Sequence, residues 1–254
     1  MTAPHTGNTP WLRRYHAAGA DAVTLVCFPH AGGSAGWFHP FSAALAPTVG
    51  VVAVQYPGRQ DRFSEPCVED LGEIAETISR ELLALPGPLA FFGHSMGASL
   101  AFEVARLREL SGAEPPLMLF LSGRSAPDTH RPPGQPVGSL DDAGLVARIR
   151  RLGGTHTELL ADPEIVGLVL PAVRGDYRAL ESYRCPPGTV LRSPLTVLTG
   201  SEDPLTTAEE ADAWRHHTTG TCTVHTFPGG HFFLEAESPA VLATITGTLA
   251  RIAV

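Results

Sequence analysis

Short apolar runs alternate with longer stretches of helical period along most of the chain. The apolar runs are rich in Val, Leu or Phe and most are followed by Gly or Pro, as is typical of buried parallel strands; they lie at 23–28, 51–55, 89–92, 117–121, 195–199 and 223–227. Helical periodicity predicts helices at 37–46, 68–85, 96–110, 207–216 and 239–252. This alternation predicts an α/β fold with an open, mostly parallel central sheet and helices on both faces.

One long interval interrupts the alternation. Residues 124–193 separate two predicted strands, although a connection in such a sheet usually takes roughly 2–6 residues. The interval contains the proline-rich stretch 131–136 and two predicted helices, at 141–152 and 163–183. It is either an ordinary helical excursion beside the sheet or a lid over a pocket at the strand ends, and its placement favours the lid. We therefore expect a single domain over residues 1–254 with a lid insertion at about 124–193.

Composition narrows the class of protein. The chain has 254 residues, of which 43% are hydrophobic and 17% charged, so it can bury a full core. Its formal net charge is −8 and no basic block is present, which argues against nucleic-acid binding. The four cysteines form no CxxC pair, so neither a disulfide framework nor a zinc site is indicated. With no signal sequence and no apolar run of membrane-spanning length, we expect a cytoplasmic protein without membrane contact, and a monomer.

A candidate nucleophile lies between a predicted strand and a predicted helix. The apolar run at 89–92 leads into Gly93-His94-Ser95-Met96-Gly97, and a helical pattern begins at once. In a nucleophile elbow the serine occupies a sharp strand-to-helix turn, and the flanking glycines keep that turn free of clashes. The GxSxG pattern alone is weak, and its position between strand and helix makes Ser95 the candidate.

A serine hydroxyl needs a base that takes its proton and a carboxylate that orients the base. On a fold of this kind, first the acid and then the histidine follow later strands. Asp203 follows the strand at 195–199, and His231 follows the strand at 223–227 in a glycine-containing loop. Ser95, Asp203 and His231 are therefore the predicted catalytic triad.

Other titratable residues compete for these assignments. Asp128 is the alternative acid, because some relatives of this fold carry the acid after the preceding strand; Glu202 and Asp176 are less favoured. His94 adjoins the nucleophile, but the elbow should point its ring away from the serine proton. Three histidines near the C-terminus lack the spacing of metal ligands and are interpreted as surface residues: His216, His217 and His225.

A second glycine-rich motif follows the first strong strand and reads Cys27-Phe28-Pro29-His30-Ala31-Gly32-Gly33. Elsewhere it would be a plain turn. After this strand it is the expected partner of the elbow, because small residues let backbone N–H groups approach a developing oxyanion. We assign the oxyanion hole to the backbone amides of Ala31 and Met96.

Taken together, these motifs resemble those of the type II (editing) thioesterases of polyketide and non-ribosomal peptide assembly lines, which are α/β-hydrolases, and of the related medium-chain fatty-acyl thioesterases. The resemblance covers nearly the whole chain. Besides the two motifs above, it rests on Trp11-Leu12-Arg13, Gln55-Tyr56-Pro57-Gly58-Arg59, Gly200-Ser201-Glu202-Asp203 and Pro228-Gly229-Gly230-His231-Phe232-Phe233.

The resemblance implies an enzyme that hydrolyses thioesters with a Ser-His-Asp triad. Its expected substrates are acyl groups, often stalled or misloaded, on the phosphopantetheine arm of acyl or peptidyl carrier proteins, and no cofactor or metal is implied. A helical lid is expected between the sixth and seventh strands of the family fold. Asp176-Tyr177 resembles a recurring pair within that lid and is a candidate for substrate binding.

Carrier domains are typically acidic, so a thioesterase with a net negative charge needs a local basic patch to dock one. Arg150 and Arg151, with Arg148, are candidates in the lid, and Arg59 or Arg62 could lie near the entrance. The alternative interpretation is a solvated, charged helix face.

Three other functions share this sequence pattern. A carboxylesterase for small oxygen esters would keep the triad, since the fold hosts many reactions. A macrocyclising thioesterase would be part of a larger synthase, and the short N-terminal segment favours a separate protein. A non-catalytic binding module should have lost a triad residue, and none is missing here.

Overall fold

The computed structural model describes residues 8–129, 136–153 and 162–252. Most of the proline-rich stretch 131–136 therefore lies outside the described residues. At the centre is a seven-stranded sheet in the order β1-β3-β2-β4-β5-β6-β7. The strands are β1 (Leu12–Arg13), β2 (Thr24–Phe28), β3 (Gly50–Val54), β4 (Leu89–His94), β5 (Leu119–Ser122), β6 (Leu195–Gly200) and β7 (Cys222–Phe227). Only β1 pairs antiparallel, and every other pairing in the sheet is parallel.

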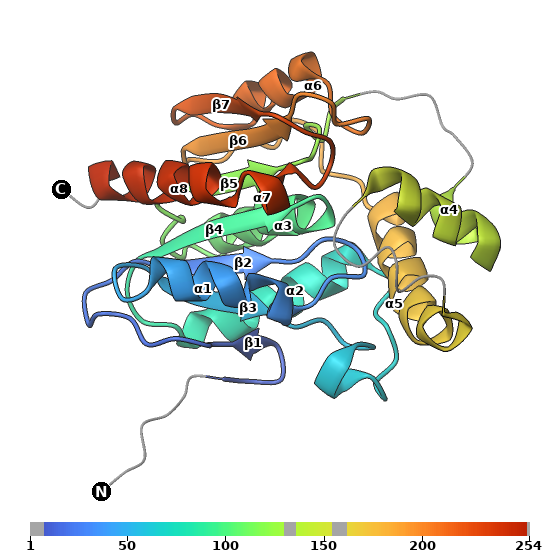
Figure 1. Cartoon of the computed structure of the whole chain (residues 1–254). Helices are drawn as coiled ribbons and strands as arrows, with labels where there is room; N and C mark the ends of the chain where they lie inside the picture. The colour runs from blue at the N-terminus through green and yellow to red at the C-terminus, as the bar shows by residue number, and fades with distance from the viewer. Residues whose placement is uncertain (1–7, 130–135, 154–161, 253–254) are drawn as a thin grey trace, which may run out of the picture.

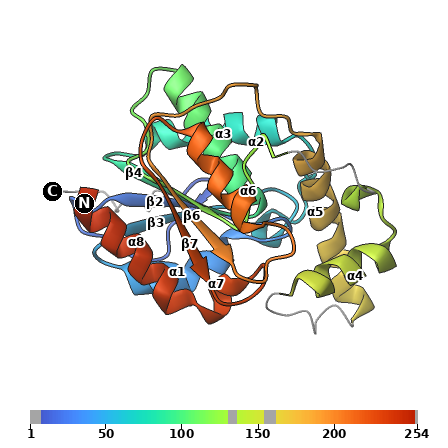
Figure 2. The same cartoon turned by 90° about the horizontal axis from the view of Figure 1, so that it is seen from above.

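Helices cover both faces of this sheet (Figure 1, Figure 2). One face carries α2 (Leu71–Glu81), α3 (Met96–Leu110) and α6 (Ala208–Asp212), and the other carries α1 (His39–Leu45), α7 (Phe233–Ala236) and α8 (Ser238–Ile252). Short 3-10 helices are η1 (Ala35–Phe38), η2 (Gln60–Arg62), η3 (Leu82–Ala84), η4 (Val137–Ser139) and η6 (Ala213–His217). The predicted fold class, an α/β protein with a mostly parallel sheet, is confirmed.

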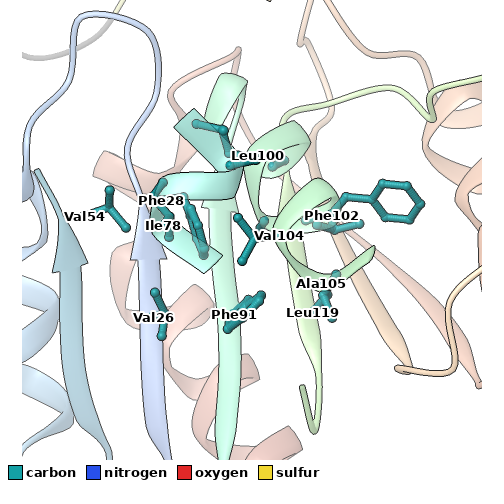
Figure 3. Close-up of a cluster of buried hydrophobic side chains, with 14 of the residues drawn as sticks. Val26, Phe28, Val54, Ile78, Phe91, Leu100, Phe102, Val104, Ala105 and Leu119 are labelled. Carbon is teal, nitrogen blue, oxygen red and sulfur yellow. The ribbon is translucent and has the colours of Figure 1, made fainter. Parts of the chain in front are cut away.

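Two hydrophobic layers, one on each face, hold these elements together. Successive side chains of a strand point to opposite faces, so β2 places Val26 in the layer under α3 and Leu25 in the layer under α1 and α8. Figure 3 shows the first layer, where Phe91 of β4 and Val104 of α3 lie close together. Strands β2 to β6 are buried along their whole length and are mostly apolar, because both faces of the sheet are covered there, and this is why they were visible in the sequence.

The long interval contains two helices that stand beside the sheet layers, α4 (Asp142–Leu152) and α5 (Pro163–Ser182). The N-cap Asp162 accepts a hydrogen bond from the N–H of Glu164 (2.9 Å), and Pro163 occupies the first helical position. These helices lie between β5 and β6, which are the fifth and sixth of the seven strands labelled here, and so within the interval where the lid insertion was expected. Among the described helices, none has the length and apolarity needed to cross a bilayer.

Candidate active site

Ser95 occupies a strained turn between β4 and α3. Its backbone angles are φ 56° and ψ −115°. Residues other than glycine rarely adopt this region, and such strained backbone conformations occur mainly at functional sites. A Cβ on Gly93 would overlap the backbone of Gly97, and a Cβ on Gly97 would overlap the carbonyl oxygen of Phe28. The two glycines of the motif are therefore required sterically, because the turn is packed backbone against backbone.

The structure brings Ser95, His231 and Asp203 together in one hydrogen-bonded chain. The Nε2 atom of His231 lies 3.0 Å from Oγ of Ser95, and Nδ1 lies 2.9 Å from Oδ2 of Asp203. Both His231 and Asp203 are buried, and the other carboxylate oxygen of Asp203 accepts a hydrogen bond from the N–H of Leu205 (2.8 Å). This arrangement can hold Nδ1 protonated, which leaves Nε2 free to take a proton from the serine.

The loops that carry the acid and the base are joined to each other. The N–H of Ser201 donates to the carbonyl of Phe227 (2.8 Å), and the N–H of Glu202 donates to that of Gly229 (2.9 Å). A Cβ on Gly200 would overlap the carbonyl oxygen of Gly230. These contacts continue the β6–β7 ladder beyond the strands, so the two loops are held as one unit.

The two backbone amides predicted to form the oxyanion hole, those of Ala31 and Met96, lie in loop and helix-start positions where the N–H is left over. Met96 is the first residue of α3, so its N–H has no carbonyl partner within the helix and lies at the positive end of the helix dipole. Beside Ala31, the N–H groups of Gly32 and Gly33 both donate within the protein. Within the part of the chain that the structure describes, the N–H groups of Ala31 and Met96 have no acceptor.

Two further imidazoles form an aromatic wall beside His231. The ring of His94 lies 5.0 Å from that of His231 and 6.1 Å from that of His30, between centroids. Burial, with His231 and His30 adding to it, holds the pKa of His94 well below its usual value, and burial together with His231 and Arg59 lowers the pKa of His30 to about 3. Both rings are therefore neutral, and the Nδ1 atom of His94 lies 3.0 Å from Oγ of Ser122, not at the nucleophile.

The alternative acid lies elsewhere. The Oδ1 atom of Asp128 lies 3.0 Å from Nε2 of His217, and the proximity of this imidazole lowers the pKa of Asp128. The structure therefore does not bring Asp128 to His231. The interpretation of His217 as a surface residue is wrong, because its ring is buried against Phe102 and Trp214.

Asp176 and Arg59 form a buried ion pair. The Nη1 and Nη2 atoms of Arg59 lie 2.5 and 2.8 Å from the two carboxylate oxygens of Asp176, and their side chains are 7% and 1% exposed. Asp176 therefore pairs within the protein instead of lining a cavity. Arg62 is also buried, stacked over Trp11 and bonded to Glu65. Both arginines are buried and neither offers an exposed charge for docking, although Arg59 lines the cavity under α4 and α5.

A cavity of about 940 Å³ lies under α4 and α5. Its lining includes Ala31 and Phe232, and Phe232 follows His231 directly in the chain. Its wall is mostly apolar and includes Trp37, Phe41, Ile149, Val169, Val173 and Tyr177. Phe63 and Leu168 also line it and are about half exposed, which places them at its mouth. Such a cavity suits an apolar chain.

The predicted lid residues differ in their relation to this cavity. Tyr177 lines it, whereas Arg150 and Arg151 are exposed on α4 and only their neighbours Ile149 and Leu152 line it. No group of three or more His, Cys, Asp or Glu side chains suited to a metal ion is present among the residues described.

The chain is similar to known proteins over nearly its whole length. A family model described as a thioesterase domain matches residues 23–249. A probable cadicidin biosynthesis thioesterase of Streptomyces griseus is 56% identical over 94% of this chain, which spans 66% of that relative's own length. The thioesterase PikA5 of Streptomyces venezuelae is 48% identical over 89% of this chain and 81% of its own. The solved structure of the type II thioesterase BorB from the borrelidin biosynthetic cluster superposes with a TM-score of 0.88 at 48% identity, covering 97% of this chain and 98% of that one.

Proposed function

The chain belongs to the thioesterase family, and from this premise we propose that it hydrolyses acyl thioesters carried on the phosphopantetheine arm of acyl or peptidyl carrier domains in polyketide or non-ribosomal peptide biosynthesis. Stalled or misloaded acyl groups are the substrates we expect. The observation that carries the proposal is the hydrogen-bonded chain of Ser95, His231 and Asp203, together with an apolar cavity whose lining includes Ala31 and Phe232.

In the proposed acylation step, Nε2 of His231 takes the proton of Ser95 as Oγ attacks the thioester carbonyl carbon. The N–H groups of Ala31 and Met96 donate hydrogen bonds to the oxygen that becomes negative. Collapse of the tetrahedral intermediate breaks the carbon–sulfur bond, and the His231 imidazolium returns the proton to the departing thiolate. The product of this step is an ester of Ser95.

In the deacylation step, His231 takes a proton from water, which attacks the ester carbonyl. Collapse then breaks the bond to Oγ, the serine regains its proton from His231, and the free acid leaves. Throughout, Asp203 accepts the Nδ1 proton of His231 in a hydrogen bond, which fixes the tautomer and stabilises the imidazolium. The proposed mechanism uses protein groups and water, and it calls for no metal or redox cofactor.

We place the acyl chain in the cavity under α4 and α5, because its wall is apolar and its lining includes Ala31. The pantetheine arm then leaves through the mouth between Phe63 and Leu168. Arg150 and Arg151 are exposed on α4 between the lining residues Ile149 and Leu152, and we propose that they face the acidic surface of the carrier domain.

The test compares the same acyl groups in three forms: on a carrier protein, on a short thiol mimic and as oxygen esters. Ser95→Ala serves as the blank, because it removes the nucleophile and leaves the turn intact. We expect turnover of carrier-bound thioesters to exceed that of oxygen esters, and Ser95→Ala to abolish both. Hydrolysis of oxygen esters with carrier-bound thioesters untouched would make the protein a carboxylesterase. Full turnover by Ser95→Ala would refute the proposed mechanism.

A further inference from the structure

A buried carboxylate on the lid helix α5 holds the loop that carries Ala31. The Oδ2 atom of Asp176 accepts a hydrogen bond from the N–H of Gly32 (2.7 Å) in addition to that from Nη1 of Arg59. The same Nη1 atom donates to the carbonyl of Gly33 (3.2 Å). The ion pair therefore forms hydrogen bonds with both residues that follow Ala31: Asp176 accepts from the N–H of Gly32, and Arg59 donates to the carbonyl of Gly33.

The backbone of the loop is also packed against α5. Gly32 has φ +78°, and a Cβ added to it would lie 2.5 Å from Cγ2 of Val173. Val173 lies about one turn before Asp176 on the same helix. Helix α5 thus packs directly against Gly32, through the side chain of Val173 and through the hydrogen bond to Asp176.

Holding Gly32 in this way also restrains Ala31. The N–H of Gly32 and the carbonyl of Ala31 belong to one planar peptide group, so a fixed direction for that N–H fixes the plane next to Ala31. Hydrogen bonds to an ionised carboxylate in a buried site are among the strongest in proteins. Burial alone would lower the pKa of Arg59, but the carboxylate of Asp176 raises it, so the guanidinium stays charged.

We propose that Asp176 and Arg59 are positioning residues that orient the N–H of Ala31, so that the oxyanion hole is complete only when α5 is seated on the loop at 29–33. The inference rests on the proposed function, because that function places the substrate oxygen at Ala31. Helix α5 also lines the cavity through Val169 and Tyr177. The helix that contacts the acyl chain is therefore the helix that assembles the oxyanion hole.

The test uses variants that leave no lone charge in the core. In an Arg59→Met background, Asp176→Asn keeps an acceptor oxygen for the N–H of Gly32, whereas Asp176→Leu has a similar size and no acceptor. Arg178→Gln is the matched control, since it breaks an exposed ion pair (2.8 Å) between the same helix and Glu69. The thermal midpoint of each variant is measured first, and the assays are run well below it.

We expect Asp176→Leu to lower kcat by about 10²-fold relative to Asp176→Asn, which is the usual effect of losing one oxyanion donor, with KM changed less than about threefold. Arg178→Gln should keep the wild-type kcat. A trifluoromethyl ketone analogue of the substrate adds to Ser95 and places its oxyanion in the hole. Its inhibition constant should therefore rise in parallel with the loss of kcat, while the affinity for an unreactive amide analogue stays constant.

Equal kcat in the Asn and Leu variants would overturn the proposal. Equal weakening of the ketone and amide analogues would also overturn it, since that pattern indicates a distorted cavity. The ketone measurement does not depend on turnover. If the wild-type protein binds the ketone but hydrolyses no acyl thioester, the proposed function fails, and the comparison of the two variants still decides whether Asp176 positions the loop.

Discussion

Asp203 accepts a hydrogen bond of 2.9 Å from Nδ1 of His231, across an interval of 28 residues in the chain. The two residues meet because β6 and β7 are neighbours in the sheet and their following loops are hydrogen-bonded together. Asp128 follows β5 and pairs with His217 instead. The structure thus separates two carboxylates that the sequence left as alternatives.

This separation predicts opposite results for two conservative variants. Asp203→Asn should lower kcat by about 10⁴-fold, because an amide at this position favours the wrong tautomer of the imidazole. Asp128→Asn should leave kcat at the wild-type level. Steady-state kinetics with a short-chain acyl thioester measures both. A large loss of kcat in Asp128→Asn with little loss in Asp203→Asn would mean that the acid has been assigned wrongly.

Gly123, directly after β5, packs closely against the rings of His94 and His231. Its φ is +59°, and a Cβ there would lie 2.7 Å from Cε1 of His94 and 3.3 Å from Cε1 of His231. Gly123→Ala should therefore displace the base and lower kcat by about 10²-fold. Gly112 has φ +76° with open space around it, so Gly112→Ala should cost about 1–2 kcal/mol of stability and leave kcat unchanged. Similar kcat values in the two variants would argue against the contact.

The neutral histidines predict a loss of stability in acid. His94 has a folded pKa well below its ordinary value of 6.5, so below that pH the unfolded chain binds a proton that the folded protein does not. Stability is then lost as the pH falls, by about 1.4 kcal/mol per pH unit for each such group. For His30, with a folded pKa of about 3, the loss continues to about that pH.

His94→Asn should remove the contribution of His94 to the loss of stability in acid. The slope of unfolding free energy against pH, from urea titrations between about pH 6 and pH 4, should fall by about 1.4 kcal/mol per pH unit relative to wild type. If His94→Asn leaves the slope of unfolding free energy against pH unchanged, then His94 is not held neutral by burial in the folded protein.

The cavity predicts a specific effect on chain length. Val169 lines it on α5, and Val169→Trp would fill part of the space. For octanoyl thioesters we expect kcat/KM to fall by about tenfold or more, with acetyl thioesters affected less than about twofold, because only the long chain needs the filled region. Val190→Trp is the control, since Val190 is exposed and does not line the cavity. Equal losses for both chain lengths would place the acyl group elsewhere.

The proposed docking surface predicts an effect that depends on the carrier. Arg151→Glu should raise KM for acyl groups on a carrier protein and leave KM for the same acyl groups on a short thiol unchanged. The increase should shrink at high salt, because exposed charges are screened. Arg251→Glu, at the far end of α8, is the control. Equal changes in KM on both substrates would exclude docking at α4.

Much of the fold was readable because buried strands and capped helices leave local signals. Helix α3 has the predicted bounds, and α5 begins where Asp162-Pro163 predicted. The two-residue β1 and the single-turn α7 were missed, since neither is long enough to show a period. The helix predicted at 68–85 begins later, at Leu71, where the side chain of Asp70 caps it. The resemblance to thioesterases is confirmed by the family model.

The site was partly predictable for the same reason. Ser95, Asp203 and His231 each follow a recognisable strand, so their order along the chain was informative. The pairing of Arg59 with Asp176 spans 117 residues, and neither residue has a local pattern that points to the other. The burial of His217 depends on its contact with Phe102. Phe102 also lies far from the histidine in the sequence, so no local pattern around His217 predicts this contact. Such contacts are decided by tertiary packing alone.

The position of Asp176 within the long insertion has a consequence for chimeric enzymes. Exchanging residues 124–193 with those of a relative is an obvious way to alter acyl preference, because α4 and α5 wall the cavity. The exchange would also replace the acidic partner of Arg59, which stays behind in the recipient. A donor segment without an acid at that position would leave a guanidinium buried without its counterion, so compatible donors should be chosen by this residue before chain-length preference is considered.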